Sequence, residues 1–204
     1  MPRAYRLGKR GEAVAASRER IVDVARELLS APKYRGLSLD SVAEEAGVSR
    51  PTIYNHFESK TGLIQAIFDD IGERIQFERV QRVLAESDPR CALEGMIGET
   101  CRAWSRDPHV IQRVLALAAT DPELAEQAKT FERMRREGMR NLVRRLRDAR
   151  LVHSSLSENE AVALLGVLTS FTTYDQLSAT GLKGPALVRA LGKLVTAVFA
   201  GDTR

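Results

Sequence analysis

Aromatic residues, cysteines and histidines are all scarce in this chain of 204 residues. Aromatic residues make up 5% of it, and it has two cysteines and three histidines. His56, His109 and His153 lie far apart and show no metal-ligand spacing. Phosphate-loop, glycine-rich nucleotide and Gly-x-Ser-x-Gly motifs are also missing. We therefore expect no enzyme activity, no metal and no cofactor, although a helical active site assembled from distant residues remains a rival interpretation.

Long apolar runs are missing as well. The longest apolar segment, residues 161–168, is far shorter than the roughly 20 residues that a membrane span needs. Charged residues instead of an apolar run follow Met1, so no secretory signal is visible. We expect a soluble, cytoplasmic protein with no membrane partner.

The two cysteines, Cys91 and Cys101, fall within one expected helix, which separates their backbones by about 15 Å. A disulfide needs Cα atoms within about 7 Å, so we expect none within the chain. Buried reduced thiols and a redox sensor are the two interpretations that this spacing leaves open.

What the chain does contain favours helices. Hydrophobic residues reach 44%, which is ample for a buried core. Ala, Leu, Arg and Glu are abundant, and few segments alternate apolar with polar residues. We therefore expect an all-α protein. Its net charge of +4 is compatible with a polyanionic partner but does not establish one.

The first 16 residues are rich in positive charge. Gly8 and Gly11 disfavour regular structure there, so we expect residues 1–16 to form a flexible basic arm. Such an arm either follows DNA, as homeodomain arms do, or is a solvated tail. Its cationic residues are Arg3, Arg6, Lys9 and Arg10.

The next three segments predict a helix-turn-helix. A first helix begins at Ser17 and ends around Ala31, and a second, with Ser38 as N-cap, covers residues 39–45. Gly47 follows it, where a left-handed backbone suits glycine. A short third helix has either Ser49 or Arg50 as N-cap. We favour Ser49, whose side chain would accept from the amide of Thr52, because Pro51 has no amide hydrogen.

The residues from Ser38 to Phe57, with Ala46-Gly47-Val48-Ser49 at the turn, make the interpretation specific. Together with the continuation Tyr54-x-His56-Phe57-x-Ser59-Lys60, this stretch resembles the DNA-binding domain of the tetracycline-repressor (TetR) family of transcriptional regulators. The resemblance covers residues 17 to about 70.

The resemblance implies a division of roles on the third helix. Arg50 and Pro51 would meet base edges, and an arginine there can give two hydrogen bonds to guanine. Asn55 would read adenine or hold a phosphate, and His56 would contact a phosphate or only brace the helix. We expect Ile53 and Phe57 to pack in the core. The full predicted DNA-binding set is Ser38, Ser49, Arg50, Pro51, Thr52, Tyr54, Asn55, His56 and Lys60.

The resemblance also implies the domain plan. Residues 17–60 would form the helix-turn-helix domain, and residues 61–204 an effector-binding and dimerisation domain. We expect a long helix from Ser59 to about Ala85, followed by helices at about 90–105, 108–118, 122–151, 157–179 and 185–200. Arginines crowd the helix at 122–151, either as a solvated face or as a nucleic-acid stripe.

Ten residues of this second domain are candidates for an effector site. Each is either plain core or a contact to a small, largely apolar ligand. They are Met96, Thr100, Cys101, Trp104, His109, Phe131, Met134, Phe171, Thr172 and Tyr174.

The last two helices are too apolar to hide both faces within one chain, so we expect a homodimer formed through them. A dimer would place two helix-turn-helix domains, which we call the reading heads, on a palindromic double-stranded DNA operator. The sequence therefore predicts a ligand-responsive regulator, a repressor that an effector releases from DNA by shifting the population between two head separations. A constitutive nucleoid-type DNA binder is the alternative.

Overall fold

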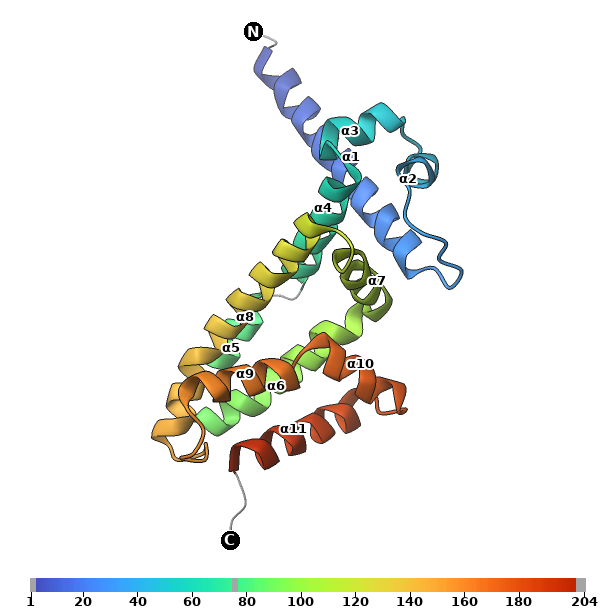
Figure 1. Cartoon of the computed structure of the whole chain (residues 1–204). Coiled ribbons are helices and arrows are strands. Elements are labelled where there is room, and N and C mark those ends of the chain that lie inside the picture. The colour runs from blue at the N-terminus through green and yellow to red at the C-terminus, as the bar shows by residue number, and fades with distance from the viewer. Residues whose placement is uncertain (1–2, 75–76, 201–204) are drawn as a thin grey trace. The chain divides into compact units, whose positions relative to one another are not determined.

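The computed structural model describes residues 3–74 and 77–200, except for the side chains of residues 3–10 and 77–78. Within these residues the chain is helical throughout and has no strand, as expected (Figure 1). The helices are α1 (Arg3–Ser30), α2 (Leu39–Ala46), α3 (Arg50–Phe57), α4 (Lys60–Arg74), α5 (Phe77–Leu84), α6 (Pro89–Arg106), α7 (Pro108–Ala118), α8 (Pro122–Asp148), α9 (Glu158–Leu168), α10 (Phe171–Ala179) and α11 (Gly184–Ala200).

The chain folds into two compact units. The first holds residues 1–71 and 112–125, and the second holds residues 72–111 and 126–204. The divisions fall inside helices α4, α7 and α8. The first unit thus extends beyond residue 60 and recruits a segment from much later in the chain. The boundary that we expect at residue 60, between the DNA-binding and effector-binding domains, remains a prediction.

In the first unit, α1 packs on α2 and α2 packs on α3 (Figure 1). Ile21, Val42 and Ile53 are fully buried where these helices meet. Arg26, on α1, pairs with Asp70 of α4 through atoms 3.2 Å apart. These contacts fix the short helices α2 and α3, which could not be stable alone.

The later segment of the first unit closes around the loop after α1. Arg113 donates to the backbone carbonyl of Leu29, and its guanidinium lies 4.6 Å from the ring centre of Tyr34. The Tyr34 hydroxyl in turn accepts from the amide of Leu37. Residues 112–125 are therefore part of the scaffold of the helix-turn-helix.

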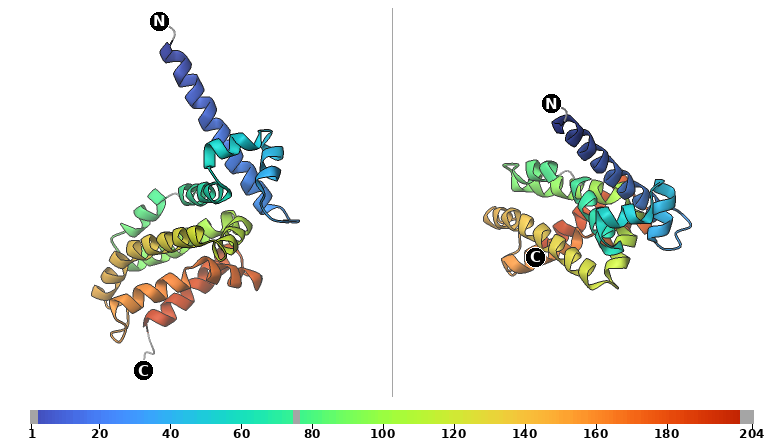
Figure 2. Two further views of the ribbon diagram at one scale, coloured as in Figure 1. Left: turned by 45° about the horizontal axis from the view of Figure 1, so that its top comes forward. Right: turned by 90° about the horizontal axis from the view of Figure 1, so that it is seen from above.

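In the second unit, α6 packs against α5, α10 and α11, and α11 also packs against α9. Figure 2 shows α9 and α11 side by side from another direction. The buried side chains between them include Ile97, Leu165, Leu191, Val195 and Phe199. None of the helices in the described part of the chain is both long and apolar enough to cross a membrane.

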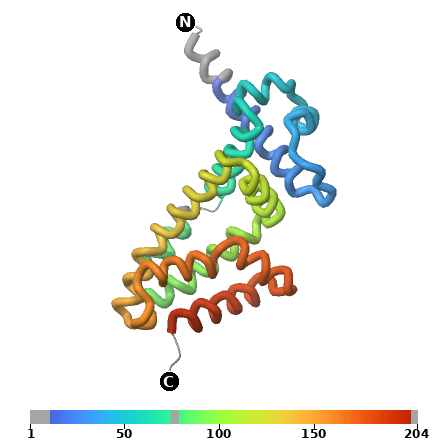
Figure 3. Tube along the Cα trace, in the orientation of Figure 1, coloured from blue at the N-terminus to red at the C-terminus, as the bar shows by residue number. Residues whose placement is uncertain are grey.

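The expectation of an irregular arm at residues 1–16 is wrong, because α1 begins at Arg3. Gly8 and Gly11 each cost roughly 1 kcal/mol relative to alanine inside a helix. The helix that follows supplies a nucleus already formed, and extending it costs less than starting a new one. Two glycines are therefore not enough to end it, as the continuous trace in Figure 3 shows from Gly11 onward. The arm's cationic side chains lie outside the described residues.

The single helix expected at 157–179 is also wrong. α9 ends at Leu168, and α10 restarts at Phe171 with Ser170 as its N-cap. The hydroxyl of Thr169 donates to the carbonyl of Leu165 at 2.7 Å, so it competes with the backbone for that acceptor. The helix expected to continue to Ala85 is described as α4 and α5, and residues 75–76 lie outside the described part.

Candidate nucleic-acid interface

The turn before the third helix has the geometry that the sequence predicts. Ser38 caps α2, and its hydroxyl oxygen accepts from the amide of Ser41 at 3.0 Å. Gly47 ends α2 with a φ of 64°, in the left-handed region where a side chain would be strained. The turn thus directs the chain back toward α2.

Ser49 is the N-cap of α3, as favoured from the sequence. Its side chain accepts from the amide of Thr52 at 3.3 Å, and the two hydroxyls are 2.8 Å apart. Pro51 lies in the first turn, where a missing amide hydrogen costs nothing. These contacts fix the start of the helix.

α3 has one buried edge and one exposed face. Ile53 and Phe57 are buried, as predicted, and the Arg18 guanidinium lies 5.2 Å from the centre of the Phe57 ring. Thr52 and His56 are half-buried on the flanks. The other predicted DNA-binding residues on this helix are exposed: Arg50, Pro51, Tyr54 and Asn55.

Arg50 is held in place by two acceptors that the sequence interpretation did not connect with it. One guanidinium nitrogen lies 3.1 and 3.2 Å from the two carboxylate oxygens of Asp40, on α2. Another donates weakly to the Tyr54 hydroxyl at 3.5 Å, and the guanidinium lies 5.7 Å from the centre of that ring. The hydrogen bond to Tyr54 and the charge of Asp40 raise the pKa of Arg50, which stays fully charged.

Lys60 is the first residue of α4 and is exposed. Only two residues separate it from Phe57, the end of α3. The hydroxyl of Ser59 accepts from the Gly62 amide at 2.9 Å. A side chain at position 62 would overlap the Phe57 carbonyl, so only glycine fits there. Thr61 donates to Asp121 at 3.1 Å. The position of Lys60 thus depends on residues from both segments of the first unit.

Five of the ten predicted effector residues are buried in the second unit. The ring centres of Trp104 and Phe171 are 5.8 Å apart, and those of Phe171 and Tyr174 are 6.2 Å apart. Met96 and Cys101 are also buried. We name these five residues the aromatic cluster. Thr100, another predicted effector residue on α6, is half-buried.

Burial affects the titrating groups of this cluster. It raises the pKa of Cys101 to about 11, so the thiol is not ionised near neutral pH. It also raises the pKa of Tyr174. Cys91, by contrast, is exposed, so the interpretation of two buried thiols is correct only for Cys101.

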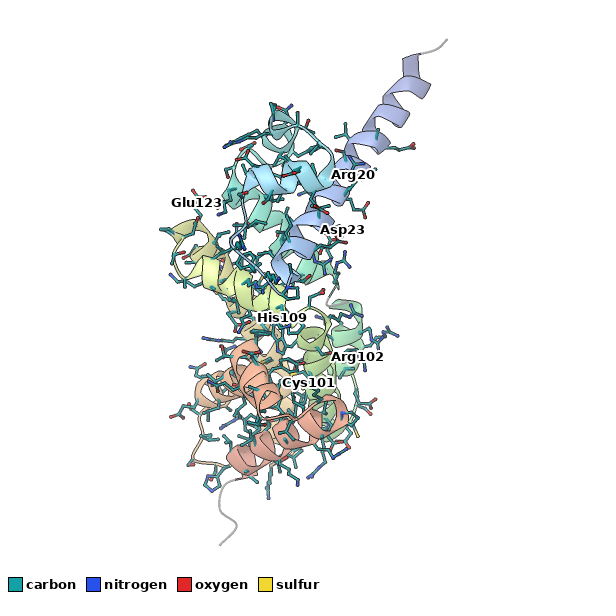
Figure 4. The ribbon with its side chains drawn as sticks, turned by 90° about the vertical axis from the view of Figure 1, so that its right-hand side faces the viewer. Arg20, Asp23, Cys101, Arg102, His109 and Glu123 are labelled. Carbon is teal, nitrogen blue, oxygen red and sulfur yellow. The ribbon has the colours of Figure 1, made fainter. Side chains whose placement is uncertain are left out.

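Four other predicted effector residues are not buried in the structure. His109, Met134 and Thr172 are exposed, and Phe131 is half-buried. Figure 4 shows Cys101 on α6 and His109 on α7. Helical periodicity identified the apolar faces but not which of them is covered.

Comparison with known proteins agrees with the geometry of the first unit. The pattern described as "Bacterial regulatory proteins, tetR family" matches residues 21–67, which include α2, α3 and the start of α4. Residues 21–67 therefore carry the pattern of the TetR family. This family consists of regulatory proteins and not of enzymes.

Two relatives within the TetR family are transcriptional repressors named KstR. The one from Mycolicibacterium smegmatis is 33% identical over 97 residues, which are 48% of each chain. The one from Mycobacterium tuberculosis is 27% identical over 135 residues, 64% of this chain and 61% of that protein. The match thus spans about half to three-fifths of the length of these relatives.

Solved structures share the fold over nearly the whole chain. A transcriptional regulator from Rhodococcus sp. Rha1 has a TM-score of 0.71 at 24% identity and covers 89% of this chain and 95% of its own. A regulator from Saccharomonospora viridis in complex with choline has a TM-score of 0.72 at 17% identity and covers 92% and 100%. At these identities the likeness establishes the fold alone.

Proposed function

We propose that this protein is a ligand-responsive transcriptional regulator of the TetR family. It is a homodimeric repressor that binds a palindromic operator in double-stranded DNA and is released by a small, largely apolar effector. The two relatives named KstR, which are repressors, support repression over activation.

One observation carries the proposal. α3 buries Ile53 and Phe57 but leaves Arg50, Pro51 and Tyr54 exposed, with Arg50 already oriented by its neighbours. A helix of eight residues with one anchored edge suits insertion into a DNA groove, because the major groove admits one α-helix. An arginine at its first turn can reach base edges.

The roles of the side chains follow from their chemistry. Arg50 presents two donors to guanine O6 and N7, while Pro51 packs against base edges. The hydroxyls and amide of Ser38, Ser49, Thr52, Tyr54 and Asn55 position the helix on phosphates, with His56 on its flank. Lys60, at the N-terminus of α4, adds its charge to the free amides there and holds another phosphate.

The dimer forms through the last helices of the second unit. Val167 on α9 is 59% exposed, and Leu194 on α11 is 41% exposed. Ala163 on α9 is also exposed and adds a small apolar side chain. Paired with a second copy, these surfaces make a four-helix contact, and two reading heads double the number of bases read.

The effector binds at the aromatic cluster, where Tyr174 is buried and Thr100, on α6, is half-buried, so both offer hydroxyls beside apolar side chains. Trp104 is the chain's one tryptophan, so its fluorescence reports binding there. Choline and a ketosteroid are the first probes, because two TetR-like structures carry these words in their names. A ligand that releases DNA without changing Trp104 fluorescence would place the effector elsewhere.

Control follows from a population shift. Operator DNA favours one separation of the two reading heads and the effector favours another. Helices α4, α7 and α8 each contain residues of both compact units and are the continuous elements that can transmit the shift. Spin labels on the two heads of a dimer would measure the separation. An operator-releasing ligand that leaves it unchanged would contradict this mechanism.

Selection of bound duplexes from a random DNA pool tests the function itself. The regulator predicts enrichment of one palindromic sequence. Uniform retention of all sequences would favour the nucleoid-type binder, and no retention would contradict DNA binding altogether.

A further inference from the structure

A groove in the second unit lies away from the aromatic cluster. It has a volume of about 1210 Å³ and is bounded by the first half of α6, the end of α8 with the loop that follows it, and the last four turns of α11. Its lining includes none of the residues of that cluster. The groove is therefore a separate feature of the same unit.

The floor of the groove is apolar. Ile97, Leu146, Val152 and Phe199 line it and are buried beneath it. The amide of His153 donates to the Phe199 carbonyl at 2.6 Å, which fastens the loop after α8 to α11. A fixed apolar surface of this kind favours contact with a hydrocarbon chain.

The rim of the groove is cationic. Glu94 is the one carboxylate among the lining residues that the structure describes. Five positive side chains share the lining with it: Arg90, Arg147, Arg150, Arg189 and Lys193.

Most of this positive charge has no carboxylate partner. Arg147 donates to the Leu156 carbonyl, and none of the ion pairs found within the described residues includes Arg90, Arg150, Arg189 or Lys193. Elsewhere in the same unit arginines are paired, as Arg140 and Arg144 are with Glu158. Positive charge without carboxylate partners is thus concentrated beside the apolar floor. A face that served only to contact water would not require this combination.

The groove lies on a different face of α11 from the apolar dimer surface. Arg189, Lys193 and Thr196 line the groove at helical spacings of four and three. Leu194, the exposed apolar residue of the proposed dimer surface on α11, follows Lys193 by one position, points about 100° further around the helix and does not line the groove. A dimer contact centred on Leu194 therefore uses a residue outside the groove lining.

We propose that this groove binds an amphipathic anion. The ligand has an alkyl chain that lies on the apolar floor and a carboxylate or phosphate head that the rim cations hold. Arginine suits such heads because its planar donors match their oxygens, and the apolar floor selects against small inorganic anions. This site goes beyond the proposed regulator function, and its test requires no DNA.

Gly192 offers a direct way to close the groove. It lines the groove, and a side chain added there meets no atom within 4 Å. Gly192→Leu should fill the space without removing a charge. Gly138→Leu is the matched control, because Gly138 also lies within a helix and has open space around its Cα but does not line the groove.

The experiment is calorimetric titration of the full chain with decanoate, decyl phosphate, decanol and inorganic phosphate. We expect one or both of the first two to bind, which identifies the head group, and the last two to bind at least about tenfold more weakly. Arg189→Gln combined with Lys193→Gln should weaken binding at least about tenfold, whereas Arg133→Gln, outside the groove, should not.

Gly192→Leu should abolish binding, and Gly138→Leu should bind as the unaltered chain does. Retained binding in Gly192→Leu would place the ligand elsewhere and overturn the proposal. Equal binding of decanol, or no binding of either amphiphile, would overturn it too. Circular dichroism and size-exclusion chromatography verify that each variant keeps its fold and oligomeric state.

Discussion

At the level of single residues, Arg50 is the side chain on which the proposed reading of DNA depends most. Asp40 holds one of its nitrogens and Tyr54 contacts another, so the guanidinium loses less freedom when it binds a base. Asp40 also places a negative charge near the DNA-facing edge, which disfavours phosphates. We infer that Asp40 gives up some affinity for DNA in general and improves discrimination.

Asp40→Asn tests this role. Removing the carboxylate frees Arg50 and removes a repulsive charge, so binding to random duplexes should strengthen while the preference for the operator falls. The measurement is the ratio of the two dissociation constants at fixed salt. Glu45→Gln, an exposed carboxylate near the other end of α2, is the control. An unchanged ratio in Asp40→Asn would show that Asp40 has no part in specificity.

Local signals explain what could be predicted about these residues. Ser38 and Ser49 accept from amides three positions later, and the amide of Gly47 donates to carbonyls three and four positions earlier, so the sequence alone indicates their roles. Asp40 and Arg50 are ten positions apart, and a turn of particular geometry brings them together. Sequence periodicity carries no information about such a pair.

At the level of elements, the break between α9 and α10 depends on partners from distant helices. Arg135 of α8 donates to the Thr169 hydroxyl at 2.8 Å and to the Gly166 carbonyl at 2.6 Å. The indole of Trp104 donates to the Thr169 carbonyl at 3.0 Å. These donors satisfy acceptors that a continuous helix would use itself. Because the partners lie 31 to 65 positions away, the break could not be predicted.

Thr169→Val tests the importance of this joint. Valine keeps the shape but leaves the half-buried Arg135 without one acceptor, so the free energy of unfolding should fall by about 1–3 kcal/mol. Urea denaturation measures it. Thr172→Val, at an exposed site three residues later, should change stability by less than about 0.5 kcal/mol. Equal effects of the two substitutions would contradict the role given to Thr169.

The start of α9 is tied to α8 by charge. Hydrogen bonds from Arg144 and Arg140 lower the pKa of Glu158 below its ordinary value of 4.5. Because the folded chain favours the ionised form, the stabilisation is complete above that value and is lost as the pH falls through the lowered pKa. The stability difference between the unaltered chain and Glu158→Gln should therefore shrink from neutral pH to about pH 3. A constant difference in urea denaturation would contradict this.

At the level of the whole molecule, the sequence predicted the structure of the first unit better than that of the second. The helix-turn-helix could be located from sequence, because its turn needs particular residue types. In the second unit most helix positions were predicted, apart from the break between α9 and α10, but the burial of individual side chains was not. Met134 and Phe171 both lie on apolar faces, and only the packing reveals that Met134 is 63% exposed while Phe171 is buried.

The proposed dimer depends on Val167 and Leu194. Replacing both with glutamate should give a monomer, because unpaired charges would be buried at the contact. Sedimentation analysis would measure the mass, and binding to a palindromic operator should weaken sharply. Met134→Glu is the control, since Met134 is more exposed than either residue but lies on α8. A dimer that survives the double substitution would place the interface elsewhere.

The central claim is that Arg50 reads bases while Lys60 holds a phosphate. Binding of the operator and of a scrambled duplex should be titrated at several salt concentrations for the unaltered chain, Arg50→Ala and Lys60→Ala. We predict that Arg50→Ala weakens operator binding by about 1–3 kcal/mol and reduces the preference for it. Lys60→Ala should weaken both duplexes alike and reduce the salt dependence by about one contact per subunit. If Arg50→Ala weakened both duplexes equally, or if Lys60→Ala affected only the operator, the account would be contradicted.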